Sequence, residues 1–139
     1  MKPCLWIILG CSVAMLGCSH FGYYKYEKPQ RAPPEVSAQV RFPNALEGGA
    51  QLTGPMMLAL KVAMSDFRPP WIKPEKQQDP EDKCLADWRY IDTTVVQAEE
   101  NLFYVLFTPD LRQCGPGFVV LDAGALYAID AQGRILAKE

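Results

Sequence analysis

Apolar residues between positions 53 and 70 recur at the spacing of one face of a helix. The positions that share this face are Met56, Leu60, Ala63, Met64 and Phe67. Thr53 precedes them and can cap a helix, and Pro55 is tolerated in a first helical turn. Pro69 and Pro70 end the pattern, because proline lacks the backbone N–H that a helix interior needs. The spacing therefore predicts one helix whose apolar face packs in a core.

After residue 84 the pattern changes to short apolar runs separated by polar turns. The runs rich in β-branched, aromatic and aliphatic residues cover residues 88–97, 102–108, 124–130 and 134–137. Residues of these types favour strands, and the polar segments 99–101 and 131–133 are typical of tight turns. The order predicts an α+β fold in which one core helix packs on a three- to four-stranded antiparallel meander sheet.

The N-terminus begins with Lys2 and an apolar run over residues 4–16. The run is shorter than the roughly 20 apolar residues that a membrane-spanning helix needs, and it is typical of a secretory signal. Residues 15–18 (Met-Leu-Gly-Cys) resemble the lipobox of bacterial lipoproteins. The resemblance implies cleavage before Cys18 and attachment of acyl chains such as palmitate to it, and Ser19 resembles the residue that accompanies an outer-membrane destination. An ordinary signal peptide and an uncut leader are the alternatives.

This interpretation divides the chain into a signal peptide at residues 1–17, a lipidated N-terminus with a flexible tether at 18–47, and a single small α+β domain at 48–139. Prolines concentrate in the tether and in the loop at residues 68–83. In the tether, Val36, Val40 and Phe42 alternate with other residues and predict a short edge strand. In the loop we expect Trp71 to fold back on the core. The alternative is an exposed Trp71 in a loop that recognises a partner.

The cysteines form the second informative pattern. Cys4 and Cys11 leave with the signal and Cys18 takes the lipid, so Cys84 and Cys114 remain as one pair. An even remainder in an oxidising envelope predicts a disulfide. Two cysteines without a neighbouring histidine make a poor zinc site, and a free buried pair is the other alternative.

The net charge and the residue types argue against several classes of function. Removing Lys2 leaves 13 basic against 16 acidic residues, a net charge near −3, so we expect no binding to nucleic acid. The single histidine, His20, lies next to the lipid and cannot join a folded catalytic triad. Asp110, Asp122 and Asp130 are candidate catalytic carboxylates, but each lies where a turn favours aspartate. We expect no cofactor and no metal.

The predicted domain resembles helix-on-curled-sheet domains of the cystatin-like, NTF2-like and PepSY types over residues 53–138, with residues 127–136 as the only quotable motif. The resemblance assigns no functional residue. The sequence as a whole predicts a non-enzymatic envelope lipoprotein, held at the outer membrane by its lipid, that binds a protein partner or supports an envelope assembly. A lipid-anchored inhibitor or immunity-like domain is the alternative, and an enzyme comes third.

Overall fold

The structure is a computed structural model that describes residues 28–43, 48–117 and 123–139. The chain divides into two units, Met1–Ala45 and Leu46–Glu139. In the described part of the first unit, residues 28–43 are all exposed to solvent and contain one short helix, α2 (Pro34–Ser37). The edge strand predicted around Val36 is therefore wrong, because two prolines in succession start a helical turn there instead. Cys18, the predicted signal peptide and the first part of the predicted tether lie outside the described residues.

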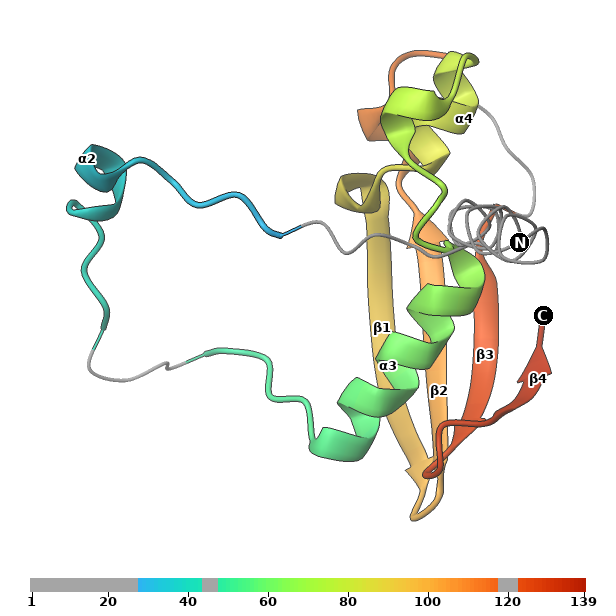
Figure 1. The fold of residues 1–139 in the computed structure, drawn as a ribbon. Helices are drawn as coiled ribbons and strands as arrows, with labels where there is room; N and C mark the ends of the chain where they lie inside the picture. The colour runs from blue at the N-terminus through green and yellow to red at the C-terminus, as the bar shows by residue number, and fades with distance from the viewer. Residues whose placement is uncertain (1–27, 44–47, 118–122) are drawn as a thin grey trace, which may run out of the picture. The chain divides into compact units, whose positions relative to one another are not determined.

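The predicted core helix is α3 (Gly54–Phe67), and the structure confirms it. It begins as the sequence indicates, because the Thr53 side chain accepts a hydrogen bond from the Met56 backbone N–H at 3.4 Å. Ala59 and Ala63 are fully buried on the face that meets the sheet. Their small side chains let the helix lie close to the strands, across one face of the sheet (Figure 1).

The sheet has four antiparallel strands in the order β1 to β4. They are β1 (Ile91–Glu99), β2 (Leu102–Pro109), β3 (Ala125–Asp130) and β4 (Ile135–Lys138). In β2 buried and exposed residues alternate, so Phe103, Val105 and Phe107 point toward α3. Tyr127 and Ile129 of β3 complete the buried layer. One core helix on an antiparallel meander confirms the predicted α+β fold.

The last hairpin is closed by Asp130. Its carboxylate accepts hydrogen bonds from the backbone N–H groups of Gln132, at 3.0 Å, and Arg134, at 2.9 Å. Gly133 has a φ of +78°, which glycine adopts without strain. This is the turn role that the sequence favoured for Asp130.

A buried hydroxyl group joins α3 to the last two strands. The Tyr127 hydroxyl donates a hydrogen bond to Oδ2 of Asp66 at 2.9 Å, and Nζ of Lys138 donates to the same oxygen at 2.9 Å. Burial raises the pKa of Tyr127, so the hydroxyl keeps its proton and remains a donor.

The segment between α3 and β1 is more structured than the sequence indicated. It contains the short 3₁₀ turns η1 (Pro74–Lys76) and η2 (Trp88–Tyr90) and the helix α4 (Pro80–Leu85). The Asp79 carboxylate caps α4 by accepting from the backbone N–H of Glu81 at 2.8 Å. The expectation that Trp71 folds back on the core is wrong, because its side chain is 65% exposed. Within the described ranges no helix is long and apolar enough to cross a bilayer.

Candidate functional site

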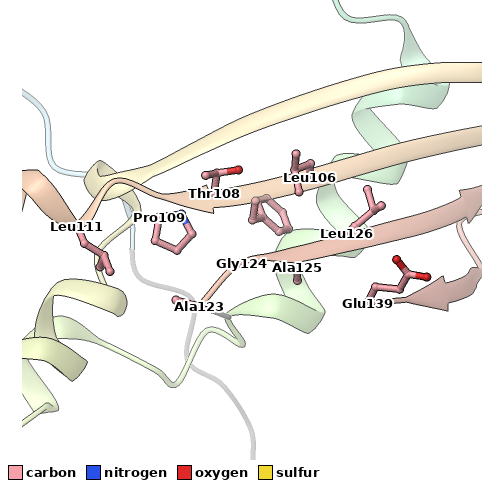
Figure 2. Close-up of a pocket in the computed structure, with 10 residues that line it drawn as sticks. Leu106, Thr108, Pro109, Leu111, Ala123, Gly124, Ala125, Leu126 and Glu139 are labelled. Atoms are coloured by element: carbon pink, nitrogen blue, oxygen red, sulfur yellow. The ribbon is translucent and has the colours of Figure 1, made fainter. Parts of the chain in front are cut away.

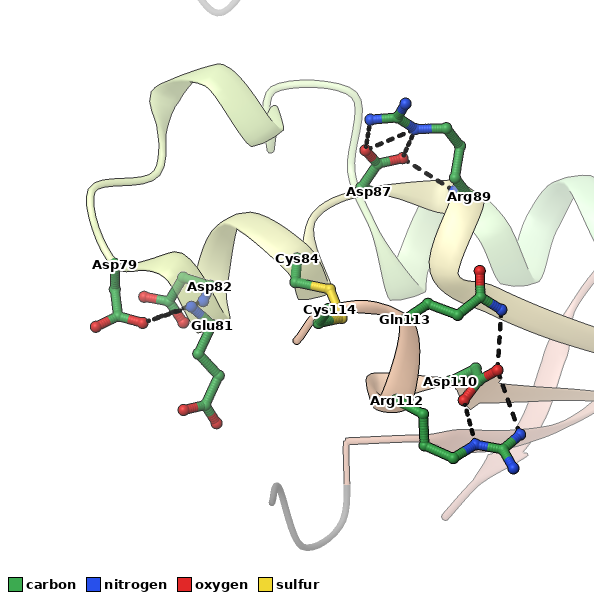
Figure 3. The surroundings of a disulfide bond; sticks show 10 residues. All are labelled: Asp79, Glu81, Asp82, Cys84, Asp87, Arg89, Asp110, Arg112, Gln113 and Cys114. Carbon is green, nitrogen blue, oxygen red and sulfur yellow. Dashed lines mark hydrogen bonds and ion pairs between the residues drawn. A yellow bond between two sulfur atoms is a disulfide. The ribbon is translucent and has the colours of Figure 1, made fainter. Parts of the chain in front are cut away.

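A disulfide joins the segment before β1 to the loop after β2, at the end of the sheet where β1 begins and β2 ends. It connects Cys84, buried on α4, to Cys114, which follows the 3₁₀ turn η3 (Leu111–Gln113), with the two Cα atoms 5.8 Å apart (Figure 3). The structure thus places together the pair that the cysteine count singled out. The bond ties α4, which precedes β1, to the loop after β2, and β1 and β2 are already paired with each other.

Arg68 occupies the junction between α3 and the loop that leads to α4. It is the residue that ends α3, and only 8% of its surface is exposed. Its guanidinium carbon lies 5.5 Å from the ring centre of Phe67 and 5.2 Å from that of Trp88. The cation therefore packs against two aromatic rings, an arrangement that attracts a positive charge through the ring faces.

One nitrogen of the Arg68 guanidinium lacks a hydrogen-bond acceptor among the described residues. This nitrogen is Nη1, and it is buried. Burial lowers the pKa of Arg68 from its ordinary value to about 10, and attraction to Asp87 opposes part of that change. At neutral pH the side chain is thus charged, buried and incompletely compensated.

Asp87 is the nearest compensating carboxylate, and Arg89 occupies it. Nε of Arg89 donates to Oδ1 and Oδ2 of Asp87 at 3.0 and 2.9 Å, and the Arg89 backbone N–H donates to Oδ1 at 3.0 Å (Figure 3). These hydrogen bonds from Arg89 are the main reason that the pKa of Asp87 is lowered. Asp87 therefore attracts Arg68 only from a distance.

A hollow of about 380 Å³ opens beside Arg68, and we call it the Arg68 pocket. Its described lining residues are Phe67, Arg68, Ile72, Gln77, Asp82, Leu85 and Ala86. Arg68 is the only cation among them, and α4 supplies Asp82 and Leu85. Trp71 and Ile72, both exposed, lie in the same loop. The pocket therefore combines one buried charge with an apolar wall and a neighbouring exposed tryptophan.

A larger hollow of about 540 Å³ lies over the ends of β2 and β3, near the C-terminal end of the chain (Figure 2). Leu106, Leu126 and Leu111 supply much of its lining, and Glu139 is the only charged residue among the described lining residues. Val96 and Tyr104, which pair with each other on β1 and β2, are also exposed but do not line it. It offers apolar contact but no arrangement of polar groups.

The candidate catalytic carboxylates are not brought together. Asp110 follows the end of β2, whereas Asp130 pairs with Leu102 at the start of β2, so the length of that strand separates them. This distance, about 25 Å at about 3.3 Å per residue, is too long for a glycosidase pair. Asp122 lies outside the described residues.

The Asp110 carboxylate accepts hydrogen bonds from two side chains of the loop that follows it. Nε of Arg112 donates to Asp110 at 2.9 Å, and the amide of Gln113 donates at 2.9 Å (Figure 3). The bond from Arg112, followed by the one from Gln113, lowers the pKa of Asp110 to about 2. No group of three or more metal-ligating side chains occurs in the described part of the chain.

The sequence analysis did not identify Arg68, although one signal was present. Arg68 follows Met64 by four residues and therefore continues the apolar stripe of α3 by one position. A charged residue at a helix end is normally exposed to solvent. The burial of Arg68 comes from the loop that covers it, and the helical pattern does not reveal that loop.

Comparison with protein-family models, with curated proteins and with solved structures finds no match for this chain, so the surface around Arg68 has to be interpreted from its own geometry and charge.

Proposed function

We propose that this chain is a non-enzymatic bacterial envelope lipoprotein, anchored at the outer membrane through Cys18, whose domain binds a protein partner or supports an envelope assembly. The observation that carries the binding role is the Arg68 pocket, where Nη1 of a buried arginine has no hydrogen-bond partner among the described residues. The membrane location is supported by the leader and lipobox in the sequence.

The lipid supplies attachment without any contribution from the domain. Each buried methylene stabilises attachment by about 0.8 kcal/mol, so two or three acyl chains hold a protein at a membrane. The folded unit is then free to present its surface to a partner. This division of tasks fits a domain whose described helices include none that could cross a bilayer.

The residue types around the Arg68 pocket favour protein binding over catalysis. Tryptophan and arginine are the residues most often found at the energetic centre of protein interfaces. Here exposed Trp71 and Ile72 lie in the loop that starts at Arg68, and Trp88 packs on its guanidinium. An arginine that stays charged at neutral pH holds an anion well but is a poor proton donor or acceptor. We therefore assign the pocket to recognition.

Site-specific photo-crosslinking in the native envelope tests the proposal. A photoreactive phenylalanine analogue replaces Trp71 in the full chain, and the matched control carries it at Thr94, which is exposed on the face of β1 opposite α3. We expect a discrete crosslinked partner protein from position 71 and no partner protein from position 94. Mass spectrometry of the product identifies the partner.

The identity of the product separates the candidate functions. Crosslinks to components of a large envelope complex support an assembly role. Crosslinks to one secreted protein favour the lipid-anchored inhibitor or immunity-like domain instead. If position 71 gives no crosslink, or if both positions crosslink the same protein equally, the result contradicts binding at the Arg68 pocket.

The anchor has an independent test. The intact mass of the membrane-extracted protein should show an acylated N-terminus at Cys18, and a Cys18→Ala variant should leave the membrane fraction. A full-length, unacylated mass would contradict the lipoprotein assignment while leaving the binding surface to the crosslinking result.

A further inference from the structure

We propose that the open edge of β1 pairs with the same edge of a second copy of this chain, across a two-fold axis at Thr94. The two sheets would then form one continuous antiparallel sheet. This inference goes beyond the proposed function, because none of the described residues that line the Arg68 pocket belongs to β1.

The two edges of the sheet differ in how they are protected from pairing. β1 and β4 are the outer strands (Figure 1). β4 has four residues, a shifted register against β3 and Lys138, and all three features discourage pairing at an edge. β1 has nine residues, and its register shifts only at the hairpin end, between Gln97 and Glu99. Residues 91–97 include no proline, lysine or arginine, so this part of the edge is regular and unprotected in the described part of the chain.

The backbone of β1 presents its unpaired hydrogen-bonding groups at every second residue. The carbonyl of Tyr90 accepts a hydrogen bond from the N–H of Asp110 at 2.8 Å, so these two residues form a hydrogen-bonded pair. Hydrogen-bonded and non-bonded pairs alternate in an antiparallel ladder, and β1 stays in register with β2 from Ile91 to Gln97. The N–H and C=O groups of the odd-numbered residues in this segment therefore point away from β2. Such a row of groups is a template for another strand.

The row matches the same row on a second copy. With an antiparallel pairing and a two-fold axis at Thr94, Ile91 lies opposite Gln97 of the second copy, and Thr93 lies opposite Val95 of the second copy. Residues whose backbone groups point outward then meet residues of the same kind. The whole regular segment of each strand is paired, so no outward group in it lacks a hydrogen-bond partner.

The side chains of the strand favour the same register. At the axis Thr94 faces Thr94 of the second copy, and threonine pairs across strands are stabilising. Asp92 lies opposite Val96, so no two charged residues of β1 face each other. An axis at Val95 would instead place Asp92 opposite the ladder position that Glu99 takes after the register shift, and two like charges there would be destabilising. The strand is thus self-complementary in one register, which makes a second copy the occupant that we infer.

Exchange of charges at the axis tests the inference on the full chain in detergent micelles. Sedimentation equilibrium over a range of protein concentrations measures the dissociation constant of the dimer. Thr94→Lys and Thr94→Glu each place two like charges face to face, whereas an equal mixture of the two variants places opposite charges there. Thr108→Lys is the matched control, because Thr108 is also exposed but lies on β2, away from the edge.

We expect the parent chain and Thr108→Lys to dimerise with the same dissociation constant. Each Thr94 variant alone should dimerise roughly fivefold more weakly at low salt, because the like charges repel each other. The mixture should recover the affinity of the parent chain or exceed it.

A backbone substitution tests the hydrogen bonds directly. Thr93→Pro removes an N–H that points outward and leaves the pairing with β2 intact, as proline at an open edge allows. The matched variant Thr93→Ala removes the side chain and keeps the N–H. The proline variant should raise the dissociation constant roughly tenfold or more, because each copy loses a donor, and the alanine variant should raise it less. Circular dichroism checks that both variants are folded.

The inference is overturned if the chain is monomeric at every concentration, if Thr93→Pro and Thr93→Ala dimerise equally, or if the Thr94 mixture shows no recovery. If Thr93→Pro fails to fold, the Thr94 mixture decides. In the native envelope, the photoreactive residue at position 94 should join two copies of this chain, and a product with a different protein would also overturn the inference. The crosslink at position 71 reports on the Arg68 pocket, so the proposed function succeeds or fails independently.

Discussion

Replacing Arg68 by methionine should stabilise the domain, which is an unusual expectation for a buried residue. Methionine keeps an unbranched, flexible side chain that can fill the space between Phe67 and Trp88, and its sulfur makes favourable contacts with aromatic rings. The change removes a buried charged group whose Nη1 has no hydrogen-bond acceptor among the described residues. Replacing buried ionic groups by hydrophobic residues of similar volume is often neutral or stabilising.

The size of the effect follows from the burial of the guanidinium. The pKa of Arg68 is lowered from its ordinary value to about 10, and at about 1.4 kcal/mol per pKa unit the charged form costs the folded state about 3 kcal/mol. Partial solvent access at the pocket reduces this figure, and the lost cation–π contacts offset about 1 kcal/mol more. We therefore expect a net stabilisation of about 1–2 kcal/mol.

The pH dependence has the matching sign. Arg68 has a lower pKa in the folded than in the unfolded chain, so the unfolded chain holds its proton more tightly. The cost is fully present at neutral pH, and it decreases as the pH rises from about 10 toward the ordinary pKa of arginine. The stability difference between the parent chain and Arg68→Met should shrink over the same interval.

Guanidinium chloride unfolding of the full chain, followed by circular dichroism, measures the change. Arg68→Met should unfold at a higher denaturant concentration, and its thermal midpoint should rise by about 4–8 °C for each kcal/mol. Arg68→Lys and the exposed control Arg112→Met should not gain stability. A methionine variant that unfolds more easily than the parent would show that Arg68 stabilises the fold. That result would refute the argument that the buried charge of Arg68 destabilises the folded state.

Three further predictions concern the framework of the domain. Cys84→Ser opens a loop of 30 residues and should cost about 3.5 kcal/mol in the chain-entropy model, measured as a lower unfolding midpoint that matches the parent under reducing conditions. Tyr127→Phe removes the hydroxyl that donates to Asp66 and should cost about 1 kcal/mol in the same assay, with an unchanged midpoint arguing against the bond. Asp110, whose pKa is lowered from 3.8 to about 2 chiefly by Arg112, favours folding above its unfolded pKa, so stability should fall as the pH drops from about 4 to 2, and Asp110→Asn should weaken that fall.

The long elements could be predicted because each has enough residues to show a pattern. The apolar stripe of α3 repeats over several turns, and β2 is a continuous run of residues that favour strands; the structure confirms both elements. The short elements between α3 and β1 could not, because α4 has six residues and one turn shows no period. A proline after Asp79 was nevertheless a start signal for α4 that the sequence analysis passed over.

The candidate site was less accessible to sequence reasoning for a different reason. The burial of Arg68 depends on Trp88, which is twenty positions later in the chain and reaches Arg68 only through the loop between them. Such long-range burial leaves no local pattern. The exposure of Trp71 was not predicted, because burial of a large aromatic side chain usually stabilises the folded protein. Here the side chain is exposed and available for contact.

The position of the disulfide has a consequence for when the chain becomes competent. Cys84 lies on the same six-residue helix as Leu85 and Asp82, so the bond that fixes this helix also fixes one wall of the Arg68 pocket. A helix this short has little stability of its own. A newly made chain with reduced thiols would therefore carry the sheet without a finished pocket, and oxidation would act as the maturation step that completes it. The same covalent event would both stabilise the domain and complete the pocket through which we propose that it binds a partner.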